Sequence, residues 1–499
     1  MEQIQISIDG REVSVPRTAT VLEAADALGI ELPTLCHRPE LPPFTSCMVC
    51  AVHDLDSGAM IPACSTRVAK GMRLATGDEE TLAFRRDALE LLFSEHAGDC
   101  KAPCRLVCPL EFDAPAFLRY SGEREWGAAA DLLEAGLPLP RTVVALCPAP
   151  CEKACRRGRH DTAVAIGAME RLVAGQLSGA DPVDAVSDVK AVVVGAGPAG
   201  LAAAWKLRAF GFAVFVLERA SAVGGSLLEC VRDGSLPASD LSSDITALRL
   251  RGIQFRCDTT VTEADLSCLA ETAAIVVVAT GAESELGAVE PSSGVVLCGD
   301  IVKRNRSPVH AMGSGLRAAR EAAALCGHVE RGVRERLHCT LGTLVEDELA
   351  EFLAGASSAP RAAGELSPSS GEEEARRCLR CDCRSAVDCR LRTLGEEYGA
   401  GNRRFPGGER LGVRIVREHP DLVFEAGKCI RCGICVRICQ AADNEPGLDF
   451  LGRGFNVAVG PPIGASLAEA LQKNAAACIA ACPTGALCWK DDKKNSEKK

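Results

Sequence analysis

The chain carries 27 cysteines among its 499 residues, and most of them fall into spaced groups. In the most regular group, near the C-terminal end, the gaps between successive cysteines are two, two and three residues. Its members are Cys429, Cys432, Cys435 and Cys439. This spacing is typical of thiolates that hold a cubane iron–sulfur cluster. The chain must therefore fold so that several sulfurs converge, and this requirement constrains it more than its length does.

A second, incomplete group follows, in which only Cys478 and Cys482 remain, while Gln472 and Ala475 stand where further thiolates are needed. Residues 420–490 resemble a bacterial two-cluster ferredoxin, in which the last cysteine of each group ligates the other group's cluster. The resemblance implies one surviving [4Fe-4S] cluster. Its ligands would be Cys429, Cys432, Cys435 and Cys482. Cys439 and Cys478 are left as free thiols or as a disulfide.

Composition excludes several classes of protein. A secreted disulfide scaffold is short and starts with a signal peptide, whereas this chain opens directly into strand-like alternation. The formal net charge of -11 and the 4% of aromatic residues argue against a nucleic-acid partner. No apolar run approaches the ~18 residues that cross a membrane. We therefore expect a cytoplasmic protein, without a membrane span, whose thiolates bind metal.

The first thirty residues predict a β-grasp layout. Residues 4–15 indicate a hairpin, because isoleucines alternate with polar residues before an Asp9-Gly10 turn. Thr20 and Glu23 then predict a capping box for a short helix that ends at Gly29.

A second group of cysteines follows this layout and predicts a [2Fe-2S] cluster. It consists of Cys36, Cys47, Cys50 and Cys64. Three ligands on a folded loop and a fourth on a returning segment suit two irons bridged by sulfide. The group resembles the [2Fe-2S] domain of the large iron–sulfur subunit of complex I and of related hydrogenase and formate dehydrogenase subunits. Four buried cysteines that act as small apolar residues are the alternative.

A third group lies on both sides of a segment, 115–136, that we expect to be helical. Its cysteines are Cys100, Cys104, Cys108, Cys147, Cys151 and Cys155. The string Cys-Pro-Ala-Pro-Cys-Glu in this group resembles the double-cluster domain of the glutamate synthase small subunit and dihydropyrimidine dehydrogenase. Since one upstream cysteine of that family is missing, His96 stands near the vacancy as a candidate ligand.

The resemblance implies two [4Fe-4S] clusters in this domain. One would be held by Cys100, Cys104, Cys155 and His96. The other would be held by Cys108, Cys147, Cys151 and the carboxylate of Glu170. For His96 an ordinary capping histidine is the alternative, and for Glu170 an ordinary helix-surface carboxylate.

A fourth group places four thiols within twelve residues. It consists of Cys378, Cys381, Cys383 and Cys389. The group predicts a further metal site, either another iron–sulfur cluster or a structural zinc. The remaining cysteines show no ligand spacing and are assigned to cores or surfaces. They are Cys230, Cys257, Cys268, Cys298, Cys326, Cys339 and Cys488.

Residues 191–218 carry a dinucleotide-binding fingerprint of strand, glycine turn, helix, strand and terminal acid. The turn comprises Gly195, Gly197, Pro198, Ala199 and Gly200, and the acid is Glu218. These glycines let the backbone approach a pyrophosphate at the positive end of a helix, and the acid can accept bonds from ribose hydroxyls. An unrelated α/β fold with a glycine-rich turn is the alternative.

Later landmarks favour FAD over NAD, because they resemble the flavin domain of the same glutamate synthase small-subunit family. They are Gly224, Gly225, Thr280, Gly281, Gly299 and Asp300. The resemblance implies that Asp300 contacts the ribityl chain and that a helix starting near Ala311 points its N-terminus at the flavin ring.

The family's second nucleotide-binding domain, for NAD(P)H, is missing. In the family this domain lies between the landmarks that correspond to Gly281 and Gly299. Only residues 282–298 separate them here, whereas a single βαβ unit takes roughly 30 residues. Gly313 and Gly315 do not replace it, since no strand precedes them. This departure argues against a dedicated nicotinamide site.

The predicted fold class is multidomain α/β and α+β. We expect a β-grasp domain at 1–79, a helical double-cluster domain at 80–185, an FAD domain without the NAD(P) insertion at 186–330, a linker and cysteine-rich patch at 331–395, a ferredoxin-like domain at 396–490, and a disordered tail at 491–499. Within the patch, the Ser/Pro/Gly/Glu composition of 355–374 predicts the linker.

Together these patterns favour an iron–sulfur flavoprotein that serves as one subunit of a larger oxidoreductase. Its cofactors would be FAD, one [2Fe-2S] cluster and about three [4Fe-4S] clusters, the count following from the ligand groups. It would pass electrons to partner subunits or a soluble carrier. One alternative is a reductase on which NAD(P)H acts directly at FAD, and another is a zinc-stapled scaffold without redox function.

Overall fold

The computed structural model describes residues 2–177, 188–282, 286, 294–304, 307–328, 337–402, 404–405, 412–442 and 446–490. The predicted tail 491–499 lies outside the described residues. The chain divides into two compact units. Unit 1 comprises Met1–Lys101, Arg334–Ala354 and Asp382–Lys499, and unit 2 comprises Ala102–Val333 and Gly355–Cys381. No helix among the described residues has the length and hydropathy needed to cross a bilayer.

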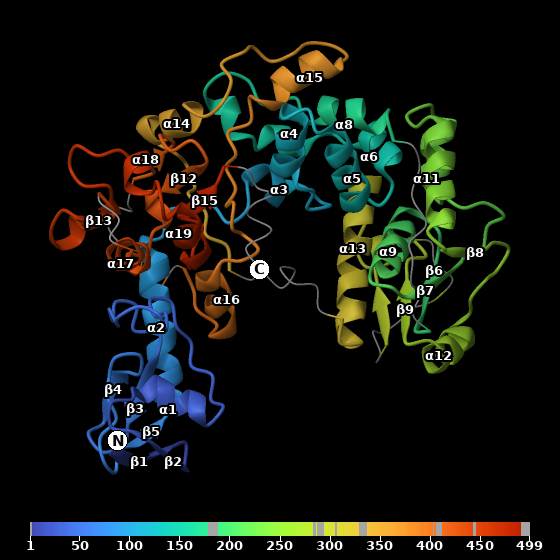
Figure 1. Ribbon diagram of the computed structural model, residues 1–499. Helices are drawn as coiled ribbons and strands as arrows, with labels where there is room; N and C mark the ends of the chain where they lie inside the picture. The colour runs from blue at the N-terminus through green and yellow to red at the C-terminus, as the bar shows by residue number, and fades with distance from the viewer. Residues whose placement is uncertain are drawn as a thin grey trace. The chain divides into compact units, whose positions relative to one another are not determined.

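Unit 1 begins with the predicted β-grasp sheet, in the order β2-β1-β5-β3-β4 (Figure 1). Its strands are β1 (Gln3–Ile8), β2 (Arg11–Pro16), β3 (Ala51–Asp54), β4 (Ala59–Pro62) and β5 (Arg73–Ala75). The hairpin pairs Ile4 with Val15 across an Asp9-Gly10 turn, as predicted. Thr20 and Glu23 cap helix α1 (Val21–Ala27) reciprocally, which confirms the predicted capping box. The alternating isoleucines of β1 bury one face of the sheet against α1.

The rest of unit 1 combines helices with two small sheets. Its helices are α2 (Glu79–Glu95), α14 (Glu346–Leu353), α16 (Arg390–Glu397), α17 (Ile434–Ala441), α18 (Leu467–Ala470) and α19 (Ala475–Ala481). Its remaining strands are β11 (Ile415–Val416), β12 (Leu422–Glu425), β13 (Asp449–Leu451), β14 (Ala458–Gly460) and β15 (Leu487–Trp489). Strand β12 pairs with β11 and β15, and α17 and α19 pack against each other. These elements surround the predicted ferredoxin-like cysteines.

Unit 2 begins with short helices. They are α3 (Pro103–Val107), α4 (Ala114–Gly122), α5 (Trp126–Gly136), α6 (Pro140–Leu146), α7 (Pro150–Lys153) and α8 (Ile166–Ala174). The predicted helical segment 115–136 forms two helices rather than one. The break falls at Arg124, whose φ of 64° is left-handed and therefore incompatible with a continuous helix.

A five-stranded parallel sheet in the order β10-β9-β6-β7-β8 forms the second part of unit 2. Its strands are β6 (Lys190–Val194), β7 (Ala213–Leu217), β8 (Gln254–Arg256), β9 (Ile275–Val278) and β10 (Val295–Leu297), and its helices are α9 (Pro198–Ala209), α10 (Leu227–Arg232), α11 (Ala238–Leu250), α12 (Glu263–Thr272) and α13 (Pro308–Leu325). Alternate residues of β6 face two separate apolar clusters: Ala191 and Val193 in one, Val192 and Val194 in the other. The sheet is therefore buried on both faces, as parallel sheets require.

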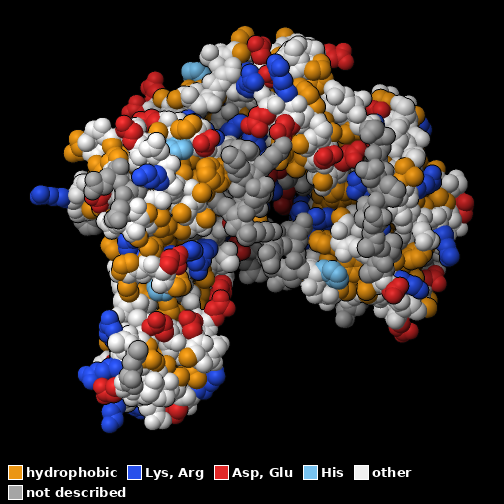
Figure 2. Space-filling view, in the orientation of Figure 1, with side chains coloured by type: hydrophobic (Ala, Val, Ile, Leu, Met, Phe, Trp, Pro, Cys, Tyr) orange, Lys and Arg blue, Asp and Glu red, His pale blue; other side chains and the backbone are white. Residues whose placement is uncertain are grey.

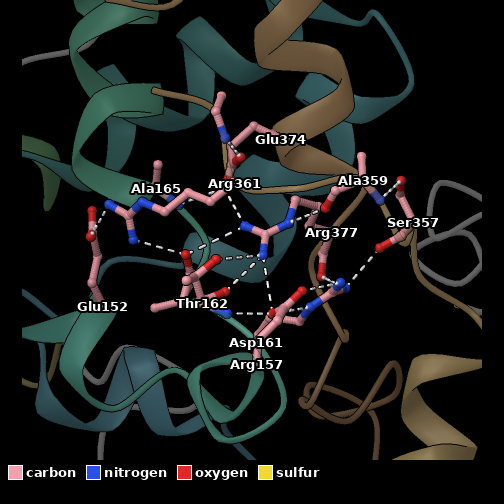
Figure 3. Close-up of polar contacts among 12 residues, drawn as sticks. Glu152, Arg157, Asp161, Thr162, Ala165, Ser357, Ala359, Arg361, Glu374 and Arg377 are labelled. Carbon is pink, nitrogen blue, oxygen red and sulfur yellow. Dashed lines mark hydrogen bonds and ion pairs between the residues drawn. The ribbon is translucent and has the colours of Figure 1, made fainter. Parts of the chain in front are cut away.

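The segment predicted to be a linker is ordered, and the prediction of a linker is wrong for its second half. Helix α15 (Pro368–Ala375) starts there, with Ser367 as its N-cap. The buried guanidinium of Arg377 holds the segment to the rest of unit 2 (Figure 3). It donates to Glu374 at 2.9 Å, to Asp161 at 3.1 Å and to the Thr162 carbonyl at 2.8 Å. Composition predicted flexibility, but these long-range bonds impose order.

Replacement of Arg377 tests this attachment. Arg377 and Glu374 have fully buried side chains, so Arg377→Leu leaves a buried carboxylate without its cation. We expect local stability to fall by about 3–5 kcal/mol, measured as faster amide hydrogen exchange in α15. Arg376→Leu is the matched control: its side chain is 56% exposed, so its loss should cost at most about 1 kcal/mol. Equal effects of the two variants would contradict the interpretation.

Acid should weaken the same attachment. The pKa of Asp161 lies below its ordinary value, chiefly because Arg157 donates hydrogen bonds to both carboxylate oxygens, with a further bond from Arg377. A depressed pKa gives stability that is present above the unfolded value of about 4 and is lost as pH falls below it. We expect Asp161→Asn to be less stable than wild type at neutral pH and to lose less stability on acidification, measured by hydrogen exchange as a function of pH.

Candidate functional site

The four cysteines of the predicted [2Fe-2S] group converge in the β-grasp domain, and all four are buried. The pKa of Cys36 is lowered, because the thiols of Cys47 and Cys64 donate hydrogen bonds to its sulfur. The thiol of Cys64 also lowers the pKa of Cys50 to about 7. The sulfurs therefore lie within contact distance in pairs, which fits two irons that each take two thiolates.

The ferredoxin-like part contains a small apolar cavity lined by the four cysteines that the sequence assigned to a single cluster. They are Cys429, Cys432, Cys435 and Cys482. The N–H of Arg431 donates to the Cys429 sulfur at 3.4 Å, a bond of the kind that stabilises a cluster ligand. Cys439 and Cys478 are both buried and form no disulfide. Their thiols contact each other, which raises the pKa of Cys478.

One arginine connects these two groups within unit 1. The guanidinium of Arg437 donates to the carbonyl of Cys36 at 2.7 Å and to the carbonyl of Cys432 at 3.5 Å. It also bonds the Pro42 carbonyl and lies 5.6 Å from the Phe44 ring centroid. The main chains of a predicted [2Fe-2S] ligand, Cys36, and a predicted ferredoxin-like ligand, Cys432, are therefore held to one side chain. Sequence spacing had no signal for this arginine.

In unit 2, three predicted cysteine ligands share their surroundings with Glu170. Burial raises the pKa of Glu170 to about 8, and its charge adds to the raised pKa values of Cys108, Cys147 and Cys151. Glu170 lies on α8, which packs against α7, where Cys151 lies. A carboxylate that is only 7% exposed beside three thiols fits a cluster ligand better than a helix-surface carboxylate.

The other predicted group of this domain is divided between the units. His96 and Cys100 belong to unit 1, and Cys104 and Cys155 belong to unit 2. The cysteine-rich patch is divided in the same way, between Cys381 and Cys383. Cys339, which had no ligand spacing, lies against Cys100: its N–H donates to the Cys100 sulfur at 3.4 Å.

The dinucleotide fingerprint forms a tight turn at the end of β6. Gly195 has a φ of 104°, and a Cβ there would lie 2.5 Å from the Ala279 carbonyl oxygen. A Cβ on Gly200 would collide with the Gly195 carbonyl, whereas a Cβ on Gly197 would meet no atom within 4 Å. The backbone therefore leaves open space in front of Gly197 at the start of α9, where a pyrophosphate would lie.

The acid of the fingerprint is positioned by the same turn. Glu218 is 9% exposed, and its carboxylate accepts the N–H of Ala196 at 2.7 Å and the N–H of Ala220 at 2.9 Å. Gly225 packs against Gly197, because a Cβ on Gly225 would lie 2.8 Å from the Gly197 Cα. Glu218 and the glycine pair Gly224-Gly225 thus border the open space.

The later landmarks lie at the ends of neighbouring strands. Thr280 and Gly281 follow β9, and Gly299 and Asp300 follow β10. Strands β9 and β10 pair directly in parallel, and only residues 279–294 connect them, fewer than the roughly 30 residues of one βαβ unit. The N–H of Gly299 donates to the Ser314 hydroxyl at 3.0 Å, which holds this turn to α13.

Helix α13 also touches the cluster domain. It begins at Pro308, one turn before the predicted start near Ala311. A Cβ on Gly313 would collide with the Pro109 carbonyl, one residue after Cys108. The backbone of the residue that follows a predicted [4Fe-4S] ligand therefore contacts the predicted flavin-facing helix within unit 2.

The surface in view carries both signs of charge. On the face shown in Figure 2, Lys and Arg side chains are interspersed with Asp and Glu over the described residues. A nucleic-acid interface is expected to gather basic side chains on one face. Within that view the surface therefore gives no support to a nucleic-acid interface.

Comparison with known families matches three segments of the chain. Residues 1–79 match the family of 2Fe-2S iron-sulfur cluster binding domains. Residues 94–180 match dihydropyrimidine dehydrogenase domain II, a 4Fe-4S cluster domain. Residues 193–243 match the NAD(P)-binding Rossmann-like domain. The chain therefore carries a 2Fe-2S domain, a 4Fe-4S domain and a Rossmann-like domain. These matches confirm the predicted resemblance and fold class.

Curated relatives resemble parts of this chain. The beta subunit of NADP(+)-dependent formate dehydrogenase from Moorella thermoacetica is 28% identical over 32% of this chain and 26% of its own length. Subunit HndD of the NADP-reducing hydrogenase from Solidesulfovibrio fructosivorans is 39% identical over 22% and 18%. Subunit PreT of the NAD-dependent dihydropyrimidine dehydrogenase from Escherichia coli is 29% identical over 37% and 46%. The chain thus spans less than half of each relative.

Two glycine variants test the nucleotide-binding turn. Because a Cβ on Gly200 collides with the Gly195 carbonyl, Gly200→Ala should destabilise the Rossmann-like domain by about 1–3 kcal/mol. Gly197→Ala meets no protein atom, so it should keep wild-type stability but lose bound nucleotide. Thermal denaturation and nucleotide content of the purified protein measure the two effects. Wild-type nucleotide content in Gly197→Ala would contradict the assigned position of the pyrophosphate.

Proposed function

We propose that the chain is an iron–sulfur flavoprotein subunit of a multisubunit oxidoreductase. It would transfer electrons between FAD, bound in the Rossmann-like domain, and several iron–sulfur clusters that lead to partner subunits or a soluble carrier. The relatives support this class, because each is named as an NAD(P)-dependent oxidoreductase or one of its subunits.

One observation carries the proposal. A single apolar cluster in unit 1 contains cysteines from three ligand groups. They are Cys36 and Cys47 of the [2Fe-2S] group, Cys389 of the cysteine-rich patch and Cys432 of the ferredoxin-like group, with half-buried Cys100 packed against them. Since neighbouring groups share one dry interior, successive clusters would lie side by side without intervening water. This arrangement suits a path for electrons.

The residues around the Rossmann-like turn fit FAD. Gly195, Gly197 and Gly200 would receive the pyrophosphate, and Glu218 would face the adenosine ribose. Asp300 would face the ribityl chain, at the turn that the Ser314 hydroxyl holds. When bound, FAD exchanges electrons with both one-electron and two-electron partners. The contact of Gly313 with Pro109 supports exchange with a cluster on Cys108, Cys147, Cys151 and Glu170.

The two alternatives have less support. Direct reaction of NAD(P)H at FAD lacks a dedicated domain, because only residues 279–294 connect β9 to β10, fewer than one βαβ unit takes. A zinc scaffold would require four sulfurs about 3.8 Å apart around one ion, as follows from a zinc–sulfur bond of about 2.3 Å. Among the described residues, no three cysteines have sulfurs that all lie within 4.8 Å of one another. The wider spacing suits iron–sulfur clusters.

Anaerobic purification tests the proposal. The full chain should contain iron, sulfide and one FAD, and dithionite reduction should give the EPR signals of a [2Fe-2S] cluster and of [4Fe-4S] clusters. A purified chain that contains zinc but no iron would contradict the proposal and favour the zinc scaffold. Rapid bleaching of the flavin by NADPH in the isolated chain would favour the direct reductase.

Two cysteines on one helix end provide a sharper prediction. Cys482 lines the ferredoxin-like cavity, whereas Cys478, one turn earlier, contacts Cys439 instead. We expect Cys482→Ala to lose one cluster, about four irons per chain, and Cys478→Ala to keep the wild-type iron content. Iron analysis and Mössbauer spectroscopy of both variants measure the difference. Loss of iron from Cys478→Ala would mean that the second ferredoxin site also holds metal.

A further inference from the structure

The cysteine-rich patch 378–389 does not lie within one compact unit. Cys378 and Cys381 fall in unit 2, and Cys383 and Cys389 fall in unit 1. A metal site of their own would require all four sulfurs to surround one small volume. Each pair would therefore need further ligands from other segments of its own unit.

The segment from His96 to Cys100 is held inside unit 1. The N–H of Ala97 donates to the Gly427 carbonyl at 2.8 Å, and the N–H of Cys100 donates to the Cys339 carbonyl at 3.0 Å. The side chain of Lys428 lies against Gly98, where an added Cβ would be 2.8 Å from it. These contacts place Cys100 beside Lys428 in the interior of unit 1.

Cys383 and Cys389 lie against the same region. A Cβ on Gly485 would collide with the Cys383 sulfur. The hydroxyl of neighbouring Thr484 donates to the Lys428 carbonyl at 2.9 Å. Cys389, at the start of α16, packs in the apolar cluster against which Cys100 is half-buried. Lys428 and Thr484 therefore connect the surroundings of Cys100 with those of Cys383.

Electrostatics agrees with this geometry. Cys383 and Cys389 both lie within electrostatic reach of Cys100 and of each other. Several buried thiolates close together are unfavourable unless a metal compensates their charge.

His96 supplies a nitrogen ligand. Its side chain is partly buried, and its Nδ1 is buried without a hydrogen-bond partner. A buried nitrogen in this state requires an explanation, and a metal ligand is one. The thiol of Cys339, in contrast, bonds Cys100 and Asn402.

We propose that His96, Cys100, Cys383 and Cys389 hold one iron–sulfur cluster inside unit 1, with Cys339 as a hydrogen-bond donor to Cys100 rather than a ligand. The patch 378–389 would then have no metal of its own. This inference rests on the proposed function only in taking the metal to be an iron–sulfur cluster.

The other two cysteines of the patch, Cys378 and Cys381, would complete a second ligand group, with Cys104 and Cys155, in unit 2. The guanidinium of Arg157 donates to the Arg377 carbonyl at 3.1 Å, which brings the residues after Cys155 to the residue before Cys378. Cys104, Cys155 and Cys378 all pack against one apolar core. Because Cys100 and His96 lie in unit 1, a cluster on Cys104 and Cys155 would need two other ligands. Cys378 and Cys381 would supply them.

Paired variants of the full chain, prepared without oxygen, test this division. Cys100→Ala and Cys383→Ala should each lose about four irons and the same EPR and Mössbauer component. The double variant should lose no more than either single variant. Cys378→Ala should lose a different component, the one that Cys155→Ala also loses. The [2Fe-2S] signal of the same samples shows that unit 1 remains folded.

Two further variants identify the fourth ligand. His96→Ala should lose or convert the component lost in Cys100→Ala, and His96→Cys should restore a cluster with a lower potential, because thiolate adds negative charge. Cys339→Ala is the matched control and should keep all its iron. Loss of iron from Cys339→Ala with none from His96→Ala would overturn the imidazole assignment.

The outcomes separate this inference from the proposed function. If Cys378→Ala and Cys383→Ala lose the same component and Cys100→Ala a different one, the patch holds its own metal and the inference is wrong, although the chain remains an iron–sulfur protein. If the wild-type chain contains no iron, the proposed function itself fails.

Discussion

The burial of many sulfurs in dry surroundings is the constraint on which this structure depends. A thiolate in an apolar interior is unfavourable unless hydrogen bonds or a metal compensate its charge. The interior of unit 1 nevertheless gathers cysteines from three ligand groups in one apolar cluster. Backbone N–H donors reach some of these sulfurs, as at Cys429 and Cys100. The fold of unit 1 is thus organised around sulfur positions as much as around its apolar residues.

In unit 2 the backbone geometry of a glycine turn is the main constraint. Its parallel sheet ends in a turn where Gly195 and Gly200 let two strands and a helix approach closely, and this leaves open space at the start of α9. Helix α13 then touches both the turn at Gly299 and the loop after Cys108. The glycine turn and a cysteine group are thereby joined through one helix.

Local patterns were predicted well because their causes are local. The hairpin at 4–15, the capping box of Thr20 and Glu23 and the strands of the fingerprint depend on neighbouring residues and were confirmed. The linker was predicted wrongly, since its order comes from Arg377, whose partners Asp161 and Thr162 lie more than 200 residues away. The break at Arg124 was missed because composition alone does not reveal a single left-handed residue.

The sequence by itself determined the kinds of site, because ligand spacing and the glycine fingerprint are chemical signatures that survive without coordinates. It indicated iron–sulfur groups and a dinucleotide turn, which agree with the matched domain families. Only the tertiary structure decided which ligands from different groups meet. Cys100 lies beside Cys339 and near Cys383 and Cys389 although more than 230 residues separate them. Such pairings result from packing of distant segments, and no spacing within one segment encodes them.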